Sequence, residues 1–202
     1  MYTAEAFLLQ LLTWRSHGFI NRLEARHVVH QELSNCWGCV YGLDRLSRPC
    51  LVIKLKNLKI SFSSSSSSLD WVLALIYLVE EALKNMDRDV EQLTALIDAK
   101  DFSLSQIHIQ ELFMIKSLLQ TYYPERLGLV LVISPNLQAK LLWRTLQSHL
   151  PESTRSKVFF VPETSPEKSR KFFLTFFEES RLPRWCIQRY FSPSPSSSSL
   201  VS

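Results

Sequence analysis

The chain has 202 residues, of which 46% are hydrophobic and 21% charged, and its formal net charge is +4. This is enough for one domain with its own core. The longest apolar run, from Trp71 to Val79, is about half of the ~20 residues that a membrane-spanning helix needs, so we expect any membrane contact to be peripheral. Four cysteines are too few for a small disulfide scaffold and favour a reducing, cytoplasmic setting.

The predicted elements begin with helices at residues 3–16 and 17–35, which we interpret as the remnant of an N-terminal helical region, 1–35. Residues 41–49 are rich in turn-forming side chains, and a short apolar strand follows at residues 51–55. Six consecutive serines at 63–68 predict a flexible surface loop or a low-complexity insertion.

The rest of the chain alternates between helices and strands. Helices are predicted at 69–86, 104–122, 137–150 and 166–179, and strands at 93–97, 129–133 and 157–161. The strands are continuously apolar, as expected where helices cover both faces of a sheet. The pattern predicts an α/β fold with a mostly parallel sheet in one domain, 36–190, followed by a disordered Ser/Pro tail at 191–202.

The sequence motifs of common α/β enzymes are absent. The chain contains no Gly-rich dinucleotide-binding loop, no phosphate-binding P-loop and no G-x-S-x-G nucleophile elbow. Its five histidines form no close pair of the kind that binds a metal. We therefore expect a protein that is not an enzyme and that has no cofactor or metal.

Cys36 and Cys39 form a C-x-x-C motif. A redox pair would require a helix N-terminus after a strand, and a zinc site would require two further ligands, for which only His27 and His30 lie nearby. Neither context is evident, so the favoured interpretation is four unrelated reduced cysteines.

Several segments have the spacing of a known family. Tyr41-Gly-Leu-Asp-Arg-Leu-Ser-Arg-Pro-Cys-Leu-Val-Ile53 is similar to G-x-D-x-x-G-R-P-V before a strand, and Leu96-Ile-Asp-Ala-Lys-Asp-Phe-Ser103 is similar to D-x-x-G-x-S. The most specific is Tyr122-Tyr-Pro-Glu-Arg-Leu-Gly128, which matches Y-P-E-R-x-G before a central strand. Together they resemble the Sec14-like (CRAL-TRIO) family of lipid-binding domains. Ser47 and Asp101 stand where that family has its turn glycines.

The resemblance implies a sheet floor, helical walls and a gate helix over a lipid-sized apolar pocket. In this chain the gate falls at residues 137–150, where leucines recur on one helical face. The expected pocket and gate residues are Leu137, Leu141, Leu142, Leu146 and Leu150. The resemblance also implies that the gate helix lines the acyl chains when closed and contacts the bilayer when open.

Members of the family that bind phosphoinositides use a Glu, a Thr and a Lys for the headgroup, and the matching positions are Glu125, Thr154 and Lys157. The chemistry is suitable, because an enclosed headgroup needs a cation for its phosphate and hydrogen-bonding partners for its hydroxyls. The resemblance therefore implies a monomer that binds one phospholipid, with phosphatidylinositol the best candidate, and transfers or presents it at membranes.

Two alternatives concern the same fold and its C-terminal part. The fold can also serve as a protein-interaction module that transfers no lipid. Phe172, Phe173, Phe176 and Phe177 share one helical face, which either docks on a membrane or, more often, packs on the sheet. Binding of single-stranded nucleic acid by the basic and aromatic side chains at 181–190 is disfavoured, because no aromatic platform on a sheet is evident.

Overall fold

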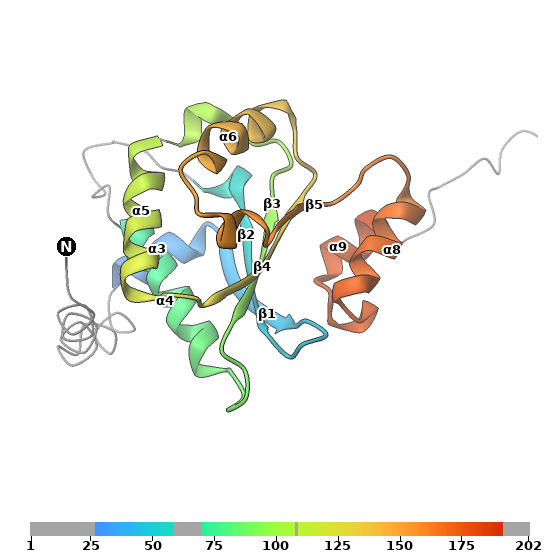
Figure 1. Cartoon of the computed structure of the whole chain (residues 1–202), viewed down its shortest axis with the longest axis horizontal. Coiled ribbons are helices and arrows are strands. Elements are labelled where there is room, and N and C mark those ends of the chain that lie inside the picture. The colour runs from blue at the N-terminus through green and yellow to red at the C-terminus, as the bar shows by residue number, and fades with distance from the viewer. Residues whose placement is uncertain (1–26, 59–69, 108, 192–202) are drawn as a thin grey trace, which may run out of the picture.

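Five strands form a single sheet in the order β1-β2-β3-β4-β5 (Figure 1). The structure is a computed structural model that describes residues 27–58, 70–107 and 109–191. The predicted helix at 3–16, the serine run at 63–68 and the tail beyond residue 191 lie outside the described residues.

β1 pairs antiparallel with β2, and all later neighbours pair in parallel. The strands are β1 (Gly38–Leu43), β2 (Pro49–Lys54), β3 (Leu93–Asp98), β4 (Leu127–Ile133) and β5 (Val158–Phe160). Parallel neighbours require a crossover between them, and helices supply each one. The predicted α/β fold with a mostly parallel sheet is therefore confirmed.

Seven α-helices and three short 3₁₀ segments lie within the described residues. The α-helices are α3 (His27–Ser34), α4 (Asp70–Lys84), α5 (Ile109–Tyr122), α6 (Leu137–Gln147), α7 (Glu152–Arg155), α8 (Pro166–Phe176) and α9 (Arg184–Tyr190). The 3₁₀ segments are η1 (Leu55–Asn57), η2 (Leu104–Gln106) and η3 (Glu179–Arg181).

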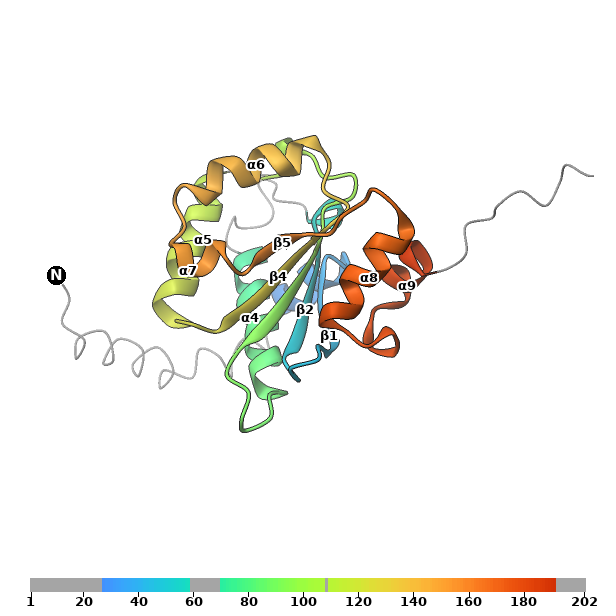
Figure 2. The same cartoon turned by 45° about the vertical axis from the view of Figure 1, so that its right-hand side comes forward.

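Helices cover both faces of the sheet, with α3, α4 and α5 on one side and α8 and α9 on the other (Figure 2). Strand β2 contributes to both layers because successive side chains of a strand point to opposite faces. Leu51 belongs to the apolar cluster with α4, whereas its neighbours Cys50 and Val52 belong to the cluster with α8 and α9. This two-sided burial explains why the strands are apolar throughout.

The structure differs from the sequence prediction at its edges. Residues 38–43 form edge strand β1, although residues 41–49 were expected to be a turn, and only the part after Leu43 is one. Two glycines, which strands disfavour, weaken the strand signal of this segment. Helices α7 and α9 are short, at 4 and 7 residues, so their periodicity is too brief to be predicted.

The turn between β1 and β2 is organised around Asp44, whose side chain is 1% exposed. Asp44 accepts hydrogen bonds from the backbone N–H of Arg48 at 2.9 Å, from Arg48 Nε at 2.6 Å and from Thr94 Oγ1 at 2.7 Å. Ser47 in the same turn has φ 58°, and Asp101 after β3 has φ 55°. Both residues occupy left-handed backbone that favours glycine, which explains why the resembling family has glycine there.

Candidate functional site

The structure brings Glu125 and Lys157 together at the amino edge of the parallel strands. Glu125 lies two residues before β4 and Lys157 directly before β5, and β4 pairs with β5. Lys157 Nζ lies 3.2 Å from Glu125 Oε2, and the Lys157 carbonyl accepts a hydrogen bond from Val130 N–H at 2.8 Å. The Lys157 side chain is 23% exposed and that of Glu125 is 78% exposed, so the pair faces solvent on the carboxylate side.

Thr154 joins this pair through the backbone. Its carbonyl accepts a hydrogen bond from Lys157 N–H at 3.2 Å, which closes the turn that follows α7. The Thr154 side chain is half-buried. All three predicted headgroup residues therefore lie at one edge of the sheet, with Glu125 and Lys157 in side-chain contact and Thr154 joined to Lys157 through the backbone.

Helix α6 occupies the position expected for the gate, although it is shorter than predicted and ends at Gln147. Asn136 caps its first turn by accepting a hydrogen bond from Ala139 N–H at 2.9 Å. Of its 11 residues only Ala139 is buried, and Leu142 packs with it against Ala99 and Phe102. Trp143 adds a second apolar contact, with its ring centroid 5.9 Å from that of Phe160 in β5.

The five predicted gate leucines are divided between the surface and partly buried positions. Leu137 and Leu141 are 72% and 45% exposed, and Leu142, Leu146 and Leu150 are partly buried. Leu104 in η2 and Ile109 in α5 are further exposed apolar side chains, at 38% and 39%. A groove of about 510 Å³ lies elsewhere, between β1, α3 and α4, and the predicted site residues do not line it.

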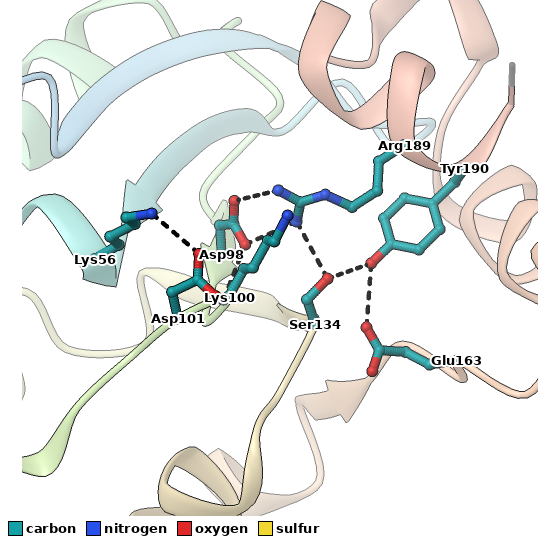
Figure 3. A network of polar contacts seen from close by, with 8 residues as sticks. All are labelled: Lys56, Asp98, Lys100, Asp101, Ser134, Glu163, Arg189 and Tyr190. Atoms are coloured by element: carbon teal, nitrogen blue, oxygen red, sulfur yellow. Dashed lines mark hydrogen bonds and ion pairs between the residues drawn. The ribbon is translucent and has the colours of Figure 1, made fainter.

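A polar network that sequence analysis missed joins the carboxyl ends of β3 and β4 to α9 (Figure 3). Arg189 donates to both carboxylate oxygens of Asp98, at 2.9 and 3.2 Å, and to Ser134 Oγ at 3.1 Å. A hydrogen bond of 2.7 Å joins Ser134 Oγ to the hydroxyl of Tyr190, which also lies 3.5 Å from Glu163 Oε1. We call these five residues the Arg189 network.

The electrostatics of this network follow from its burial. Burial raises the pKa of the Tyr190 hydroxyl above its ordinary value, and the hydrogen bond to Ser134 opposes that rise. Burial alone would lower the pKa of the Arg189 guanidinium, but its hydrogen bonds and charge interaction with Asp98 outweigh burial and raise it. Tyr190 therefore stays a neutral hydroxyl and Arg189 a cation under ordinary conditions.

Asp98 is the aspartate of the segment that resembles D-x-x-G-x-S, so the sequence motif indicated that this residue matters. Arg189 lies 91 residues away, and no sequence pattern indicated that it contacts Asp98. Its guanidinium also lies 5.1 Å from the centre of the Trp185 ring. Arg189 and Trp185 belong to the basic and aromatic side chains that the nucleic-acid alternative requires, and both make contacts within the domain.

The phenylalanines of α8 pack on the sheet. Phe173 and Phe177 are 0% exposed and belong to the cluster with β4 and α9, and Phe172 and Phe176 pack against that cluster. Of the two interpretations of this face, the one in which it covers the sheet is confirmed, and full burial of Phe173 and Phe177 excludes membrane docking through these two side chains.

The cysteines of the C-x-x-C motif, Cys36 and Cys39, are exposed, while Cys50 and Cys186 are buried. Cys36 lies between α3 and β1, and Cys39 lies in β1, so the motif is not at the start of a helix. Although Cys39 is exposed as a residue, partial burial of its thiol raises the pKa of Cys39; the charge of Lys54 opposes the rise and nearby Cys36 adds to it. Within the described residues, no three His, Cys, Asp or Glu side chains gather closely enough to hold a metal ion.

Among residues 27–58, 70–107 and 109–191, no helix is both long and apolar enough to cross a bilayer.

Comparison with known proteins assigns the chain to a family. The CRAL/TRIO domain family model matches residues 34–185. Protein real-time of Drosophila melanogaster is 26% identical over 181 residues, which cover 82% of this chain and 27% of that protein. Protein real-time of Anopheles gambiae is 24% identical over 172 residues, which cover 78% of this chain and 25% of that protein. The chain thus spans about a quarter of the length of these relatives.

A solved structure has the same fold. The crystal structure of Sfh5 superposes with a TM-score of 0.63 at 19% sequence identity, covering 79% of this chain and 59% of that one. Because the matched residues include all five strands, the family assignment covers the whole described sheet. The chain belongs to the CRAL/TRIO domain family, whose members are generally lipid-binding proteins.

Proposed function

We propose that this domain binds a single phospholipid, with phosphatidylinositol the best candidate, and transfers or presents it at membrane surfaces. The observation that carries the proposal is the 3.2 Å approach of Lys157 Nζ to Glu125 Oε2 at the amino edge of β4 and β5. Membership of a lipid-binding family supports the class of ligand, and this pair supports the class of headgroup.

The headgroup chemistry divides between the three residues. Lys157 supplies the cation that a phosphate diester requires. Glu125 offers acceptor oxygens to ring hydroxyls, and Thr154 contributes a hydroxyl. Because the ion pair is partly exposed, separating it to admit a phosphate costs at most about 1 kcal/mol.

The acyl chains are proposed to lie in apolar space beneath α6, where each buried methylene is worth about 0.8 kcal/mol. That energy would be lost in water, so α6 has to open at a bilayer. The exposure of Leu137 and Leu141, 72% and 45%, supports this role, because they can enter the interfacial region as the helix moves.

Lipid identification from freshly purified protein tests the proposal directly. Native mass spectrometry should show a species heavier than the bare chain by the mass of one phospholipid, and lipid extraction should identify it. A protein that carries no lipid, and that takes up none from vesicles of phosphatidylinositol and phosphatidylcholine, would exclude lipid binding.

Vesicle-to-vesicle transfer tests the headgroup site. Lys157→Ala should slow transfer of labelled phosphatidylinositol about tenfold, because a charge-assisted contact is lost, and leave phosphatidylcholine transfer unchanged. Lys168→Ala, at an exposed lysine of α8, is the matched control and should change neither rate. Equal loss of both lipids in Lys157→Ala would reject the headgroup role.

A protein-interaction module is the second candidate. The observation that favours it is the β1 edge, whose six residues carry no charge and lie beside the 510 Å³ groove. In that case the purified domain should be free of lipid, and transfer assays should show no activity for any headgroup.

A further inference from the structure

The turn that leads from β4 into α6 is held by side chains of the C-terminal helix α9. Ser134 is the first residue after β4, and its Oγ contacts both Arg189 Nη1, at 3.1 Å, and the Tyr190 hydroxyl, at 2.7 Å. The same guanidinium is anchored on Asp98 at the end of β3. Two neighbouring residues of α9 therefore fasten this turn to the sheet (Figure 3).

Ser134 needs such support because its backbone is strained. Its φ is 49°, in the left-handed region that non-glycine residues seldom adopt, and Pro135 follows it. A residue before proline favours extended backbone instead. Such conformations persist only where surrounding contacts impose them, and here the contacts come from Arg189 and Tyr190.

Helix α6 depends on its first turn for its position. Besides the Asn136 cap, Asn136 Nδ2 donates to the Phe102 carbonyl at 2.6 Å, and Gln138 Oε1 accepts from Leu104 N–H at 2.7 Å. Only Ala139 of α6 is buried. Half-buried Trp143 adds one ring contact, with its centroid 5.9 Å from that of Phe160 in β5. A helix with polar attachments at one end and few fully buried side chains along its length can pivot at that end at low cost.

We propose that Arg189 and Tyr190 are positioning residues that hold the Ser134 turn and so set how often α6 moves away from the sheet. The role of this movement in lipid exchange rests on the proposed function, whereas the restraint on α6 does not. The polar contacts act through Ser134, so α9 controls a helix that begins 47 positions earlier in the chain than its own first residue.

Hydrogen exchange of the intact chain, followed by mass spectrometry, tests the restraint without any ligand. Tyr190→Phe removes the hydroxyl and keeps the ring that packs 5.2 Å from Phe173. Amides of residues 137–147 should then exchange about fivefold faster, since one net hydrogen bond is lost, while those of α4 stay unchanged. Arg189→Lys keeps the charge beside Asp98 but loses the guanidinium fork, and it should act in the same direction.

Two further variants separate positioning from general destabilisation. Thr94→Val removes a hydroxyl that bonds to Asp44, away from the Ser134 turn, and should not speed exchange in α6 selectively. Ser134→Ala removes the contacts with both Arg189 and Tyr190, so it should speed exchange in α6 at least as much as Tyr190→Phe does. The double variant of Ser134→Ala with Tyr190→Phe should exchange α6 no faster than Ser134→Ala alone, because both changes break the contact between these two residues. Unchanged exchange in α6, or an equal rise in α4, overturns the proposal.

Lipid-transfer assays then distinguish the restraint on α6 from the use of that restraint in lipid exchange. If Tyr190→Phe loosens α6 and also changes the rate of phosphatidylinositol transfer, both the restraint and its use in lipid exchange are supported. If α6 loosens and the wild-type chain neither carries nor takes up lipid, the restraint stands and the proposed function fails.

Discussion

Lys157 Nζ and Glu125 Oε2 lie 3.2 Å apart although the two residues are 32 positions apart in the chain. The contact exists because β4 and β5 are parallel neighbours, so the residues that precede them emerge at the same edge of the sheet. One consequence is that the two charges lie side by side at this edge without being close in sequence.

Exchanging the two charges should preserve stability and abolish headgroup recognition. In the double variant Glu125→Lys with Lys157→Glu the ion pair can re-form, so the free energy of unfolding should change by less than about 1 kcal/mol. Phosphatidylinositol transfer should fall as in Lys157→Ala, because the cation now stands on the more exposed position. Retained transfer would show that only the net charge of this edge matters.

Polar substitution of the exposed α6 leucines should weaken vesicle binding without affecting folding. Leu137→Gln and Leu141→Gln remove apolar surface that is 72% and 45% exposed, so each should change stability by about 0.5 kcal/mol or less. Co-sedimentation with anionic vesicles measures the loss. Leu46→Gln, at a position 68% exposed in the turn before β2, is the matched control and should bind vesicles as the wild type does.

Asp44→Ala should be severely destabilising. The carboxylate is 1% exposed and bonds to Arg48 and Thr94, so its loss leaves a largely buried guanidinium without its partner. Breaking a buried pair in this way costs about 3 to 5 kcal/mol, which urea unfolding would measure. Asp101→Ala removes an exposed carboxylate paired with Lys56 and should move the midpoint little. Similar losses in both variants would contradict the central role of Asp44.

Glycine substitution at Ser47 should stabilise the domain by about 1 kcal/mol, because its φ of 58° strains a residue that has a Cβ atom. Gly42→Ala should do the opposite. Gly42 has φ 67°, and a Cβ there would lie 2.8 Å from the Arg181 carbonyl oxygen. The melting temperatures of the two variants, measured by thermal unfolding, should therefore shift in opposite directions from that of the wild type.

Two cysteines should react with a thiol reagent in the native protein and four after unfolding, since Cys36 and Cys39 are exposed and Cys50 and Cys186 are buried. Cys39 should react slowly near neutral pH, because burial of its thiol raises its pKa and leaves little thiolate. Quantitative labelling with and without denaturant measures both counts. Fast modification of Cys186 in the native state would contradict the packing of α9.

Alkaline pH should destabilise the domain through its buried thiols. Burial raises the pKa of Cys186 from 9.0 to about 12 and raises that of Cys50 as well. In the unfolded chain these thiols ionise near 9.0, so their contribution is intact below that pH and is lost as the pH rises toward the folded value. Urea unfolding across this range should show the decline, and Cys186→Ala should make it shallower.

The amino-acid sequence by itself determined the central architecture. Continuous apolar runs at 93–97 and 129–133 predicted strands that match β3 and β4, because strands buried on both faces carry no alternation. The Tyr122–Gly128 segment also located Glu125, and the family resemblance located Thr154 and Lys157, at what proved to be one edge of the sheet. These features are local or follow from the order of parallel strands, so they can be predicted from the amino-acid sequence alone.

Only the tertiary structure decided which side chains meet across long distances and which remain exposed. The contact of Arg189 with Asp98 spans 91 residues and depends on where α9 packs, which no local pattern records. Likewise, the leucines of α6 have the same periodicity whether they line a core or face solvent, and the position of the helix left Leu137 and Leu141 at the surface. Periodicity reports the face of a helix, while the neighbour that covers that face is set by the path of the whole chain.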